Sequence, residues 1–330
     1  MSVITFFNHK GGVGKTTLLF NVGIALAGTG RRILFVDADP QANLTGTALS
    51  ASSYLEQIEA EQTIYHALLP VIRTTGEPLV MNPIKIRDTA WIIPGHILLS
   101  QYEESLATGW SDTLAGRYAG FQQTTAFWRV IESAASAVNA DTVLIDVGPS
   151  VGALNRAVLL SSDGFVVPLS PDLFSLTALP SVGGAITSWV GEWTVAVSQA
   201  KRTGVDLQLP GGLPAGRPAP LGYISQQFAS YRSAPTAAFQ RWLNEIPGAY
   251  VRDVAGKLAN AGLKVPAAVG QIGTVRNLSS LVPMAQEANA AIFELSGAEA
   301  RGAQYVRAKD TLGDFIALGE DIERRMAEVG

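Results

Sequence analysis

The chain of 330 residues contains no cysteine, and this absence excludes one large class of redox chemistry. Iron–sulfur clusters are held by cysteine thiolates, so a chain without cysteine has no ligands of its own for such a cluster. The same absence fits a reducing cytosol. Histidine is also scarce, and the three residues His9, His66 and His96 are too scattered to show the spacing of a metal site.

Charge and long apolar runs are scarce as well. Charged residues make up 16% of the chain and hydrophobic residues 47%, which is enough to bury a large core. No apolar stretch approaches the 18 residues of a membrane span, and the first residues run straight into a predicted strand without room for a signal peptide. We therefore expect a soluble, cytoplasmic protein. The acidic stretch 312–326 would be repelled by anionic lipid, so we expect a packed terminal helix and no membrane attachment.

What the chain does have, directly after the apolar run 3–7, is a phosphate-binding loop. The sequence KGGVGKTT at 10–17 ends in the pattern of a P-loop, and the helical stretch 18–26 follows it. Its glycines allow a tight turn that aims backbone N–H groups at phosphate oxygens. Lys15 would reach the β- and γ-phosphates, and Thr16 would offer its hydroxyl to Mg²⁺. The predicted nucleotide-binding residues are Lys10, Gly11, Gly12, Val13, Gly14, Lys15, Thr16 and Thr17.

Acidic residues follow two short apolar strands further along the chain. Asp37 and Asp39 come after the run 33–36, and Asp146 comes after the run 143–145. Acids at the carboxyl ends of strands lie where ligands bind in α/β sheets. We predict that Asp146 helps to hold Mg²⁺, as the second acid that a P-loop ATPase needs. Asp37 either takes part in catalysis or pairs with Lys15 or a backbone amide.

These motifs resemble those of the deviant-Walker-A ATPases, the family that includes the ParA partition and MinD positioning proteins. The resemblance covers most of the chain, and its four segments occur in family order. They are KGGVGKTT at 10–17, VDADPQAN at 36–43, VLIDVGPS at 143–150 and PLSPDLFSLTAL at 168–179. The absence of cysteine separates the chain from the iron–sulfur members of the same fold.

The resemblance implies a role for each residue of the site. Lys10 would be the signature lysine, which reaches across an ATP-dependent homodimer to the phosphates on the partner subunit. Lys15 and Asp39 would be catalytic with it, Asp39 by orienting the attacking water. Thr16, Asp39 and Asp146 would form the Mg²⁺ site. Two triphosphates that face each other need cationic neutralisation at close range, which gives Lys10 a physical reason to be there.

Three segments leave alternatives open. Asn43 and Thr45 are either switch I residues or simple turn residues. Gly148 replaces the first of two prolines usual in switch II, so the coupling of that loop to the nucleotide is in doubt. Where relatives place an asparagine or threonine to contact adenine, this chain has Ser225, Gln226 and Gln227, which are base readers or a solvated strand end.

Alternating strands and helices predict an α/β fold, with a mostly parallel, twisted sheet flanked by helices on both faces. We expect one P-loop ATPase domain over residues 1–330. It would include a helical excursion at about 50–122 and a Pro/Gly-rich loop at 209–220. The loop is either functional or a surface loop without consequence.

The function we expect is that of a ParA-like ATPase. Mg²⁺ and ATP would close a sandwich dimer, and slow hydrolysis, stimulated by a partner protein, would drive the partition or positioning of DNA or another cargo. The alternative is a nucleotide-dependent scaffold with vestigial hydrolysis and no DNA binding. A small-molecule kinase or ligase on the same fold is a weaker third candidate.

DNA contacts are the least certain part of this expectation. Arg276 is the candidate for nonspecific, nucleoid-associated DNA binding, because VRNLSSLVPMAQ at 275–286 resembles the DNA-contacting stretch of the family. Arg232, Arg241, Arg252 and Lys257 would extend that surface, or all of them are ordinary solvated residues. A net charge of −4 and the lack of a basic run lower the expectation of DNA binding.

Overall fold

One eight-stranded sheet runs through the computed structural model of the chain, in the order β3-β4-β2-β5-β1-β6-β7-β8. The structure describes residues 1–226, 237–276, 278 and 280–330. Neighbouring strands pair in parallel, except that β3 runs antiparallel to β4 at one edge. The strands are β1 (Ser2–Phe6), β2 (Ile33–Ala38), β3 (Ile84–Arg87), β4 (Ala90–Ile93), β5 (Thr142–Val147), β6 (Gly164–Leu169), β7 (Ala219–Gln226) and β8 (Gln271–Val275).

The central strands are apolar on both faces because helices cover both sides of the sheet. In β2, Leu34 and Val36 belong to one hydrophobic core, whereas Ile33 and Phe35 belong to the other. This division follows from the alternation of side chains along a strand. The runs predicted at 33–36 and 143–145 lie within β2 and β5. The predicted α/β fold with a mostly parallel sheet is therefore confirmed.

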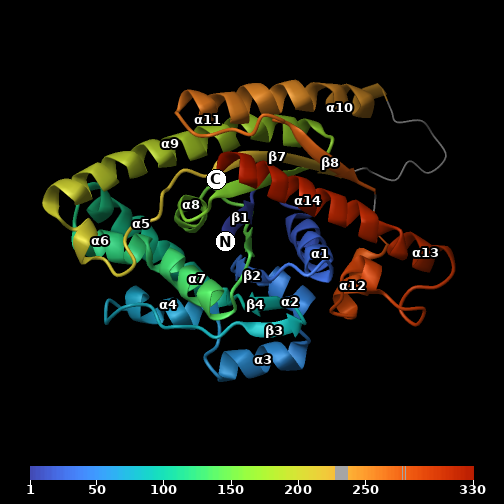
Figure 1. Cartoon of the computed structure of the whole chain (residues 1–330), viewed down its shortest axis with the longest axis horizontal. Coiled ribbons are helices and arrows are strands. Elements are labelled where there is room, and N and C mark those ends of the chain that lie inside the picture. Colours follow the sequence, from blue (N-terminus) through green and yellow to red (C-terminus); the bar gives the residue numbers. More distant parts are fainter. Residues whose placement is uncertain (227–236, 277, 279) are drawn as a thin grey trace.

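The two cores lie under two sets of helices, with α1 beside α14 on one side of the sheet and α7 and α9 on the other (Figure 1). The smaller core packs against α1 (Lys15–Gly28), α2 (Asn43–Ala48), α12 (Val282–Glu287), α13 (Ala303–Lys309) and α14 (Thr311–Val329). The larger core packs against α4 (Ile64–Ile72), α5 (Ser100–Leu114), α6 (Tyr118–Thr124), α7 (Ala126–Ala137), α8 (Ala153–Leu160), α9 (Leu173–Thr203), α10 (Ala237–Tyr250) and α11 (Gly256–Asn260). The acidic stretch 312–326 is thus a packed terminal helix, as predicted.

The stretch at 50–122 contains both helices and strands. It begins with α3 (Ala51–Glu59) and α4, forms the β3–β4 hairpin at the sheet edge, and returns through the short helix η1 (Ile97–Leu99) into α5 and α6. The strand-like run at 90–94 largely coincides with β4, which pairs with β2. The Pro/Gly-rich segment follows the short helix η2 (Asp206–Gln208) and forms neither helix nor strand from 209 to 218, where it leads into β7.

Helix α9 has the length and composition of a membrane span, although the sequence shows no unbroken apolar run there. Its best 18-residue window has a mean hydropathy of 1.3 because glycine, alanine and small polar residues lie between the large apolar ones. Of that window, 44% is buried inside the structure, with Leu179, Ile186 and Trp193 in the larger core. Core helices of soluble proteins share this property, so the helix is weak support for a membrane span.

Helix α9 also crosses a short π-helix, η3 (Val251–Ala255), at very close range. The contact is made at Gly183, where an added Cβ would lie 1.8 Å from the carbonyl oxygen of Asp253. The next residue, Gly184, is exposed and has no atom within 4 Å of its own hypothetical Cβ. Glycine is therefore required for close packing at position 183 but not at position 184. Substituting each in turn distinguishes the effect of packing from the low helix propensity of glycine.

We predict that Gly183→Ala destabilises the fold by about 1–3 kcal/mol, because the helices must move apart to admit the methyl group. Gly184→Ala should be neutral or stabilising by up to about 1 kcal/mol, since alanine is the better helix former. Urea unfolding of the two variants, followed by circular dichroism, measures the difference. Equal stabilities would show that α9 and η3 do not approach each other this closely.

Candidate nucleotide site

The loop between β1 and α1 has the backbone conformation that a phosphate cradle requires. Gly12 and Gly14 have φ values of 72° and 71°, in the left-handed region that favours glycine. Gly14 is also crowded, because an added Cβ would lie 1.9 Å from Nε2 of Gln226 at the end of β7. The loop therefore needs glycine at 14 for two reasons, and the side chain of Gln226, at the half-buried end of β7, lies against the cradle.

Asn8 fixes the start of this loop. Its side chain is fully buried, and Nδ2 donates to the carbonyl oxygen of Pro168 in β6 at 2.9 Å. Its Oδ1 accepts from the backbone N–H of Lys10 at 3.0 Å. One asparagine thus ties the loop to the neighbouring strand and positions the backbone of Lys10. No local sequence pattern indicates this role, because Pro168 lies 160 residues away.

Lys15 and Thr16 begin α1 and point into a buried acidic site. Nζ of Lys15 lies 3.5 Å from the carbonyl oxygen of Lys10, and Oγ1 of Thr16 donates to Oδ2 of Asp146 at 2.6 Å. Burial lowers the pKa of Lys15, while the carboxylates of Asp146 and Asp39 act in the opposite direction. Burial, helped by the charge of Asp37, raises the pKa of Asp146 to about 8. The site is therefore short of positive charge.

The donor set at Asp146 fits a magnesium ion. Its Oδ1 atom is buried and has no hydrogen-bond partner in the described part of the chain, whereas buried carboxylate oxygens are normally paired. A carboxylate oxygen beside a threonine hydroxyl is a suitable set of ligands for Mg²⁺, which keeps several water molecules and takes phosphate oxygens as well. Within the described residues, no three acidic or histidine side chains could hold a metal by themselves. Thr16 and Asp146 could thus hold Mg²⁺ together with a bound nucleotide.

Asp37 is fully buried and serves the structure of the strand end. Its Oδ2 accepts from the backbone N–H and the hydroxyl of Thr45 at 2.8 and 2.7 Å, and its Oδ1 accepts from the backbone N–H of Asp39 at 3.2 Å. Burial raises its pKa to about 7. Thr45 in turn accepts from the backbone N–H of Gly95 at 2.8 Å. Asp37 was expected either to take part in catalysis or to pair with Lys15 or a backbone amide, and the geometry favours pairing with backbone amides. Thr45 has the same structural role. Asn43 begins α2 and is exposed.

Asp39 lies against the segment predicted as switch II. Its Oδ1 accepts from the backbone N–H of Gln41 at 2.9 Å, and a Cβ on Gly148 would lie 3.1 Å from the same oxygen. A Cβ at position 148 would therefore be in tight contact with Asp39, which would have to shift by a few tenths of an ångström. The loop is still held, because the buried Asn155 donates to the carbonyl oxygens of Gly148 and Ser150, both at 2.8 Å.

Lys10 is engaged within its own chain. Its ammonium group pairs with the carboxylate of Asp172 and lies 3.4 Å from Oγ of Ser175 and 5.8 Å from the ring of Phe174. Asp172 is the N-cap residue of α9, where its Oδ1 accepts from the backbone N–H of Ser175 at 2.7 Å. Both partners of the pair are partly exposed, at 23% and 31%. In the single chain, the signature lysine therefore rests on α9.

The predicted site residues are brought together from four strand ends. Residues 10–17, Asp39 and Asp146 surround one cradle, with Gln226 above it. Ser225 bonds instead to Thr274 at 3.1 Å, and Gln227 lies outside the described residues. His9 borders the cradle, and burial together with the charge of Lys15 lowers its pKa. Asn8, Asp172 and Asn155 are site residues that the motifs did not identify, although Asp172 lies inside a segment that carries the resemblance.

Three of the candidate DNA contacts that the structure describes have partners within the chain. Arg276 is exposed just after β8. Arg241 pairs with Glu245, Arg252 pairs with Asp253, and Lys257 donates to the carbonyl oxygen of Pro180 at 3.2 Å. Arg232 lies outside the described residues.

The chain is similar to known proteins in both sequence and fold. The family model described as "AAA domain" matches residues 1–189. The chain is 34% identical over 185 residues to the probable plasmid-partitioning protein ParA of Thermus thermophilus, which covers 54% of this chain and 48% of that protein. The chain spans about half the length of the first curated relatives it matches.

Two solved structures show a similar fold. Protein DIP2308 from Corynebacterium diphtheriae has a TM-score of 0.71 and 27% identity, over 88% of this chain and 97% of that one. A putative plasmid partition protein from Borrelia burgdorferi, bound to AMPPNP, has a TM-score of 0.59 and 17% identity, over 98% of each chain.

The match over more than half of the chain, the partition proteins among its relatives and the cradle with its extra lysine agree with one another. The chain belongs to the AAA-domain family of ParA/MinD type.

Proposed function

We propose that this protein is a ParA-like ATPase that dimerises around two molecules of ATP and hydrolyses them slowly to partition or position DNA or another cargo. The observation that carries the proposal is the cluster of Lys15, Thr16 and Asp146 at the cradle, with Lys10 at its rim. Lys15 and Asp146 are buried, and Thr16 is half-buried. The carboxylate charge in this cluster is not fully paired with cations. A magnesium nucleotide would supply a cation for the carboxylate and an anion of the right size for the cradle. We place its action in the cytoplasm of a bacterial or archaeal cell.

Each residue has a defined task in this proposal. Lys15 and the backbone N–H groups of the loop bind the β- and γ-phosphates. Thr16 and Asp146 hold Mg²⁺, which neutralises charge on the phosphate oxygens. Asp39 orients the water that attacks the γ-phosphorus, and inorganic phosphate and ADP leave. Gly148 and Asn155 keep switch II against Asp39, so a change in that loop on partner binding would reach the attacking water.

The ion pair of Lys10 with Asp172 is weak enough to be exchanged. Partly exposed ion pairs contribute only about 0–1 kcal/mol, because water screens them and two long side chains are ordered. A triphosphate in a water-poor interface attracts an ammonium group more strongly. We therefore propose that Lys10 leaves Asp172 on dimerisation and reaches the phosphates bound by the partner subunit.

The first experiment tests this dimer. Wild-type protein, Lys10→Ala and the control Lys85→Ala, a lysine on the exposed β3, are mixed with Mg²⁺ and a non-hydrolysable ATP analogue, and their mass is measured by light scattering. Wild type and the control should double in mass, whereas Lys10→Ala should bind the nucleotide and stay monomeric. Monomers in all three samples would contradict the sandwich dimer.

The same three proteins decide the DNA proposal in a gel-shift assay. If the dimer holds nucleoid DNA through Arg276 and its neighbours, only the proteins that dimerise should retard a nonspecific duplex, and they should do so only with nucleotide. Retardation should weaken as salt rises, because phosphate contacts release counterions. A dimer that leaves DNA unshifted would favour a cargo other than DNA.

A second experiment tests hydrolysis. Asp39→Asn keeps the size of the side chain but removes its charge, so it should bind ATP and dimerise while phosphate release falls by at least about tenfold. Asp88→Asn, at a fully exposed position, should hydrolyse ATP at the wild-type rate. Phosphate release is measured with a coupled assay at saturating ATP.

Equal rates for Asp39→Asn and wild type would favour the alternative function, a nucleotide-dependent scaffold with vestigial hydrolysis. The acidic balance of the chain and Gly148 motivate that alternative. Gly148 is the weaker of these two reasons. The loop that contains it is held in place, because Gly148 packs on Asp39 and Asn155 makes three hydrogen bonds to the loop.

A further inference from the structure

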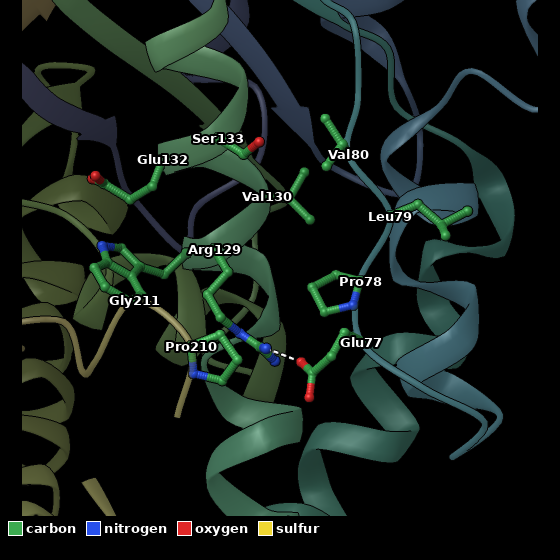
Figure 2. Close-up of a pocket in the computed structure, with 11 residues that line it drawn as sticks. Glu77, Pro78, Leu79, Val80, Arg129, Val130, Glu132, Ser133, Pro210 and Gly211 are labelled. Carbon is green, nitrogen blue, oxygen red and sulfur yellow. Dashed lines mark hydrogen bonds and ion pairs between the residues drawn. The ribbon is translucent and has the colours of Figure 1, made fainter. Parts of the chain in front are cut away.

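A groove of ≈ 330 Å³ lies on the outer face of α7, on the side of the larger core. Three segments far apart in the sequence line it: residues 77–80 after α4, the middle of α7 from 128 to 133, and residues 210–211 (Figure 2). The first belongs to the excursion at 50–122, and the last belongs to the Pro/Gly-rich loop at 209–220. The excursion and the Pro/Gly-rich loop, which the nucleotide site does not use, therefore meet over α7.

The groove presents apolar side chains to solvent. Leu79 is 52% exposed and Val80 is 73% exposed, and Pro78, Trp128 and Pro210 line the space beside them. The backbone N–H of Leu79 donates to the carbonyl oxygen of Ala67 in α4 at 2.8 Å, which holds the segment in place. Clustered exposed apolar groups around a hollow are typical of binding sites, whereas isolated ones are ordinary.

The charge of the groove is unbalanced. The guanidinium of Arg129 is only 8% exposed, pairs with Glu77 and donates to the carbonyl oxygen of Gln122 at 2.9 Å, so its charge is already neutralised. Glu132, on the next turn of α7, is half-buried and has no hydrogen-bond or ion-pair partner among the described residues. Burial and the charge of Asp163 raise its pKa, although the amine of Met1 acts in the opposite direction. One unpaired carboxylate thus lies beside an apolar surface.

We propose that this groove binds a short segment of a partner protein in which a bulky apolar side chain stands next to a lysine or arginine. The apolar side chain would lie on Val80, Trp128 and Pro210, and the cation would pair with Glu132. A cation at this position makes the ion pair that Glu132 lacks, and a volume of ≈ 330 Å³ suits one or two side chains and not a whole helix.

The groove lies away from the nucleotide site. Asp163, which acts on Glu132, immediately precedes β6 and therefore stands at the amino end of the parallel strands. The cradle, Asp39 and Asp146 stand at their carboxyl ends. A partner bound at the groove would be held by the ATPase without contact to the switch loops, so the groove serves recruitment and not the stimulation of hydrolysis.

Fluorine NMR of the full chain tests this proposal. The six tryptophans are replaced by 5-fluorotryptophan, and the signal of Trp128 is identified by its loss in Trp128→Phe. Three blocked hexapeptides of glycine and alanine are titrated into the protein: one with leucine followed by arginine at its centre, one with leucine followed by glutamate, and one with alanine followed by arginine. Val80→Ser and Glu132→Gln are titrated in parallel, and neither residue belongs to the nucleotide site.

The leucine–arginine peptide should shift the Trp128 signal to saturation, and each of the other two peptides should bind at least about tenfold more weakly. Glu132→Gln should lower the affinity for the leucine–arginine peptide by about tenfold and abolish its preference over the leucine–glutamate peptide. Val80→Ser should weaken every peptide that carries leucine. Phosphate release with ATP should be unchanged by the peptide.

Several outcomes would overturn the proposal. An unmoved Trp128 signal with the leucine–arginine peptide, or equal binding of the leucine–glutamate peptide, removes the charge complementarity on which it rests. If Val80→Ser and Glu132→Gln both bind the peptide as tightly as wild type does, the peptide binds elsewhere on the protein. A Trp128 signal that shifts with protein concentration alone, and no longer does so in Val80→Ser, would make the groove a contact between copies of this chain.

Discussion

The structure depends on the burial of acidic charge at the carboxyl ends of β2 and β5. Asp37 and Asp146 are paired residues in the parallel register of these strands, and both are fully buried. Two carboxylates in that position repel each other and lose hydration, so the fold must supply donors or cations. Asp37 accepts three hydrogen bonds from residues 39 and 45. Asp146 is therefore the acid that still needs donors or cations. Lys15 and the hydroxyl of Thr16 supply part of what Asp146 needs, and the part that is still lacking supports the proposed magnesium nucleotide.

Close approach of backbone to neighbouring groups is the second constraint. Gly14 allows the cradle to lie under Gln226, Gly148 allows switch II to lie on Asp39, and Gly183 allows α9 to lie on η3. Interiors are packed so densely that one methyl group at any of these positions would displace a neighbour. At Gly148 the structure revises the interpretation drawn from the sequence. The glycine that left the coupling of this loop open is the residue that lets the loop lie against Asp39.

The sequence predicted those parts of the site that follow from local order along the chain. Strand, glycine loop and helix occur within residues 2–28, and an acid after an apolar run predicts a strand end, so the cradle, Asp146 and the sheet could be predicted. Contacts across the sheet could not. Asn8 bonds to a residue 160 positions away and Lys10 pairs with one 162 positions away, and neither pair shares a sequence pattern. The choice between two roles for Asp37 also required the structure, because only the position of Thr45 decides it.

The two ends of the parallel strands divide the molecule between two kinds of chemistry. At the carboxyl ends, fixed donors and buried acids suit the small, highly charged ligand proposed for this site. At the amino ends, α7 carries an apolar groove with one unpaired carboxylate, where a bound segment is recognised by shape and a single charge. Because α7 leads directly into β5, the helix that carries Glu132 is continuous in the chain with the strand that carries Asp146. Under the two proposals, the partner segment and the nucleotide would therefore bind toward opposite ends of the same strand.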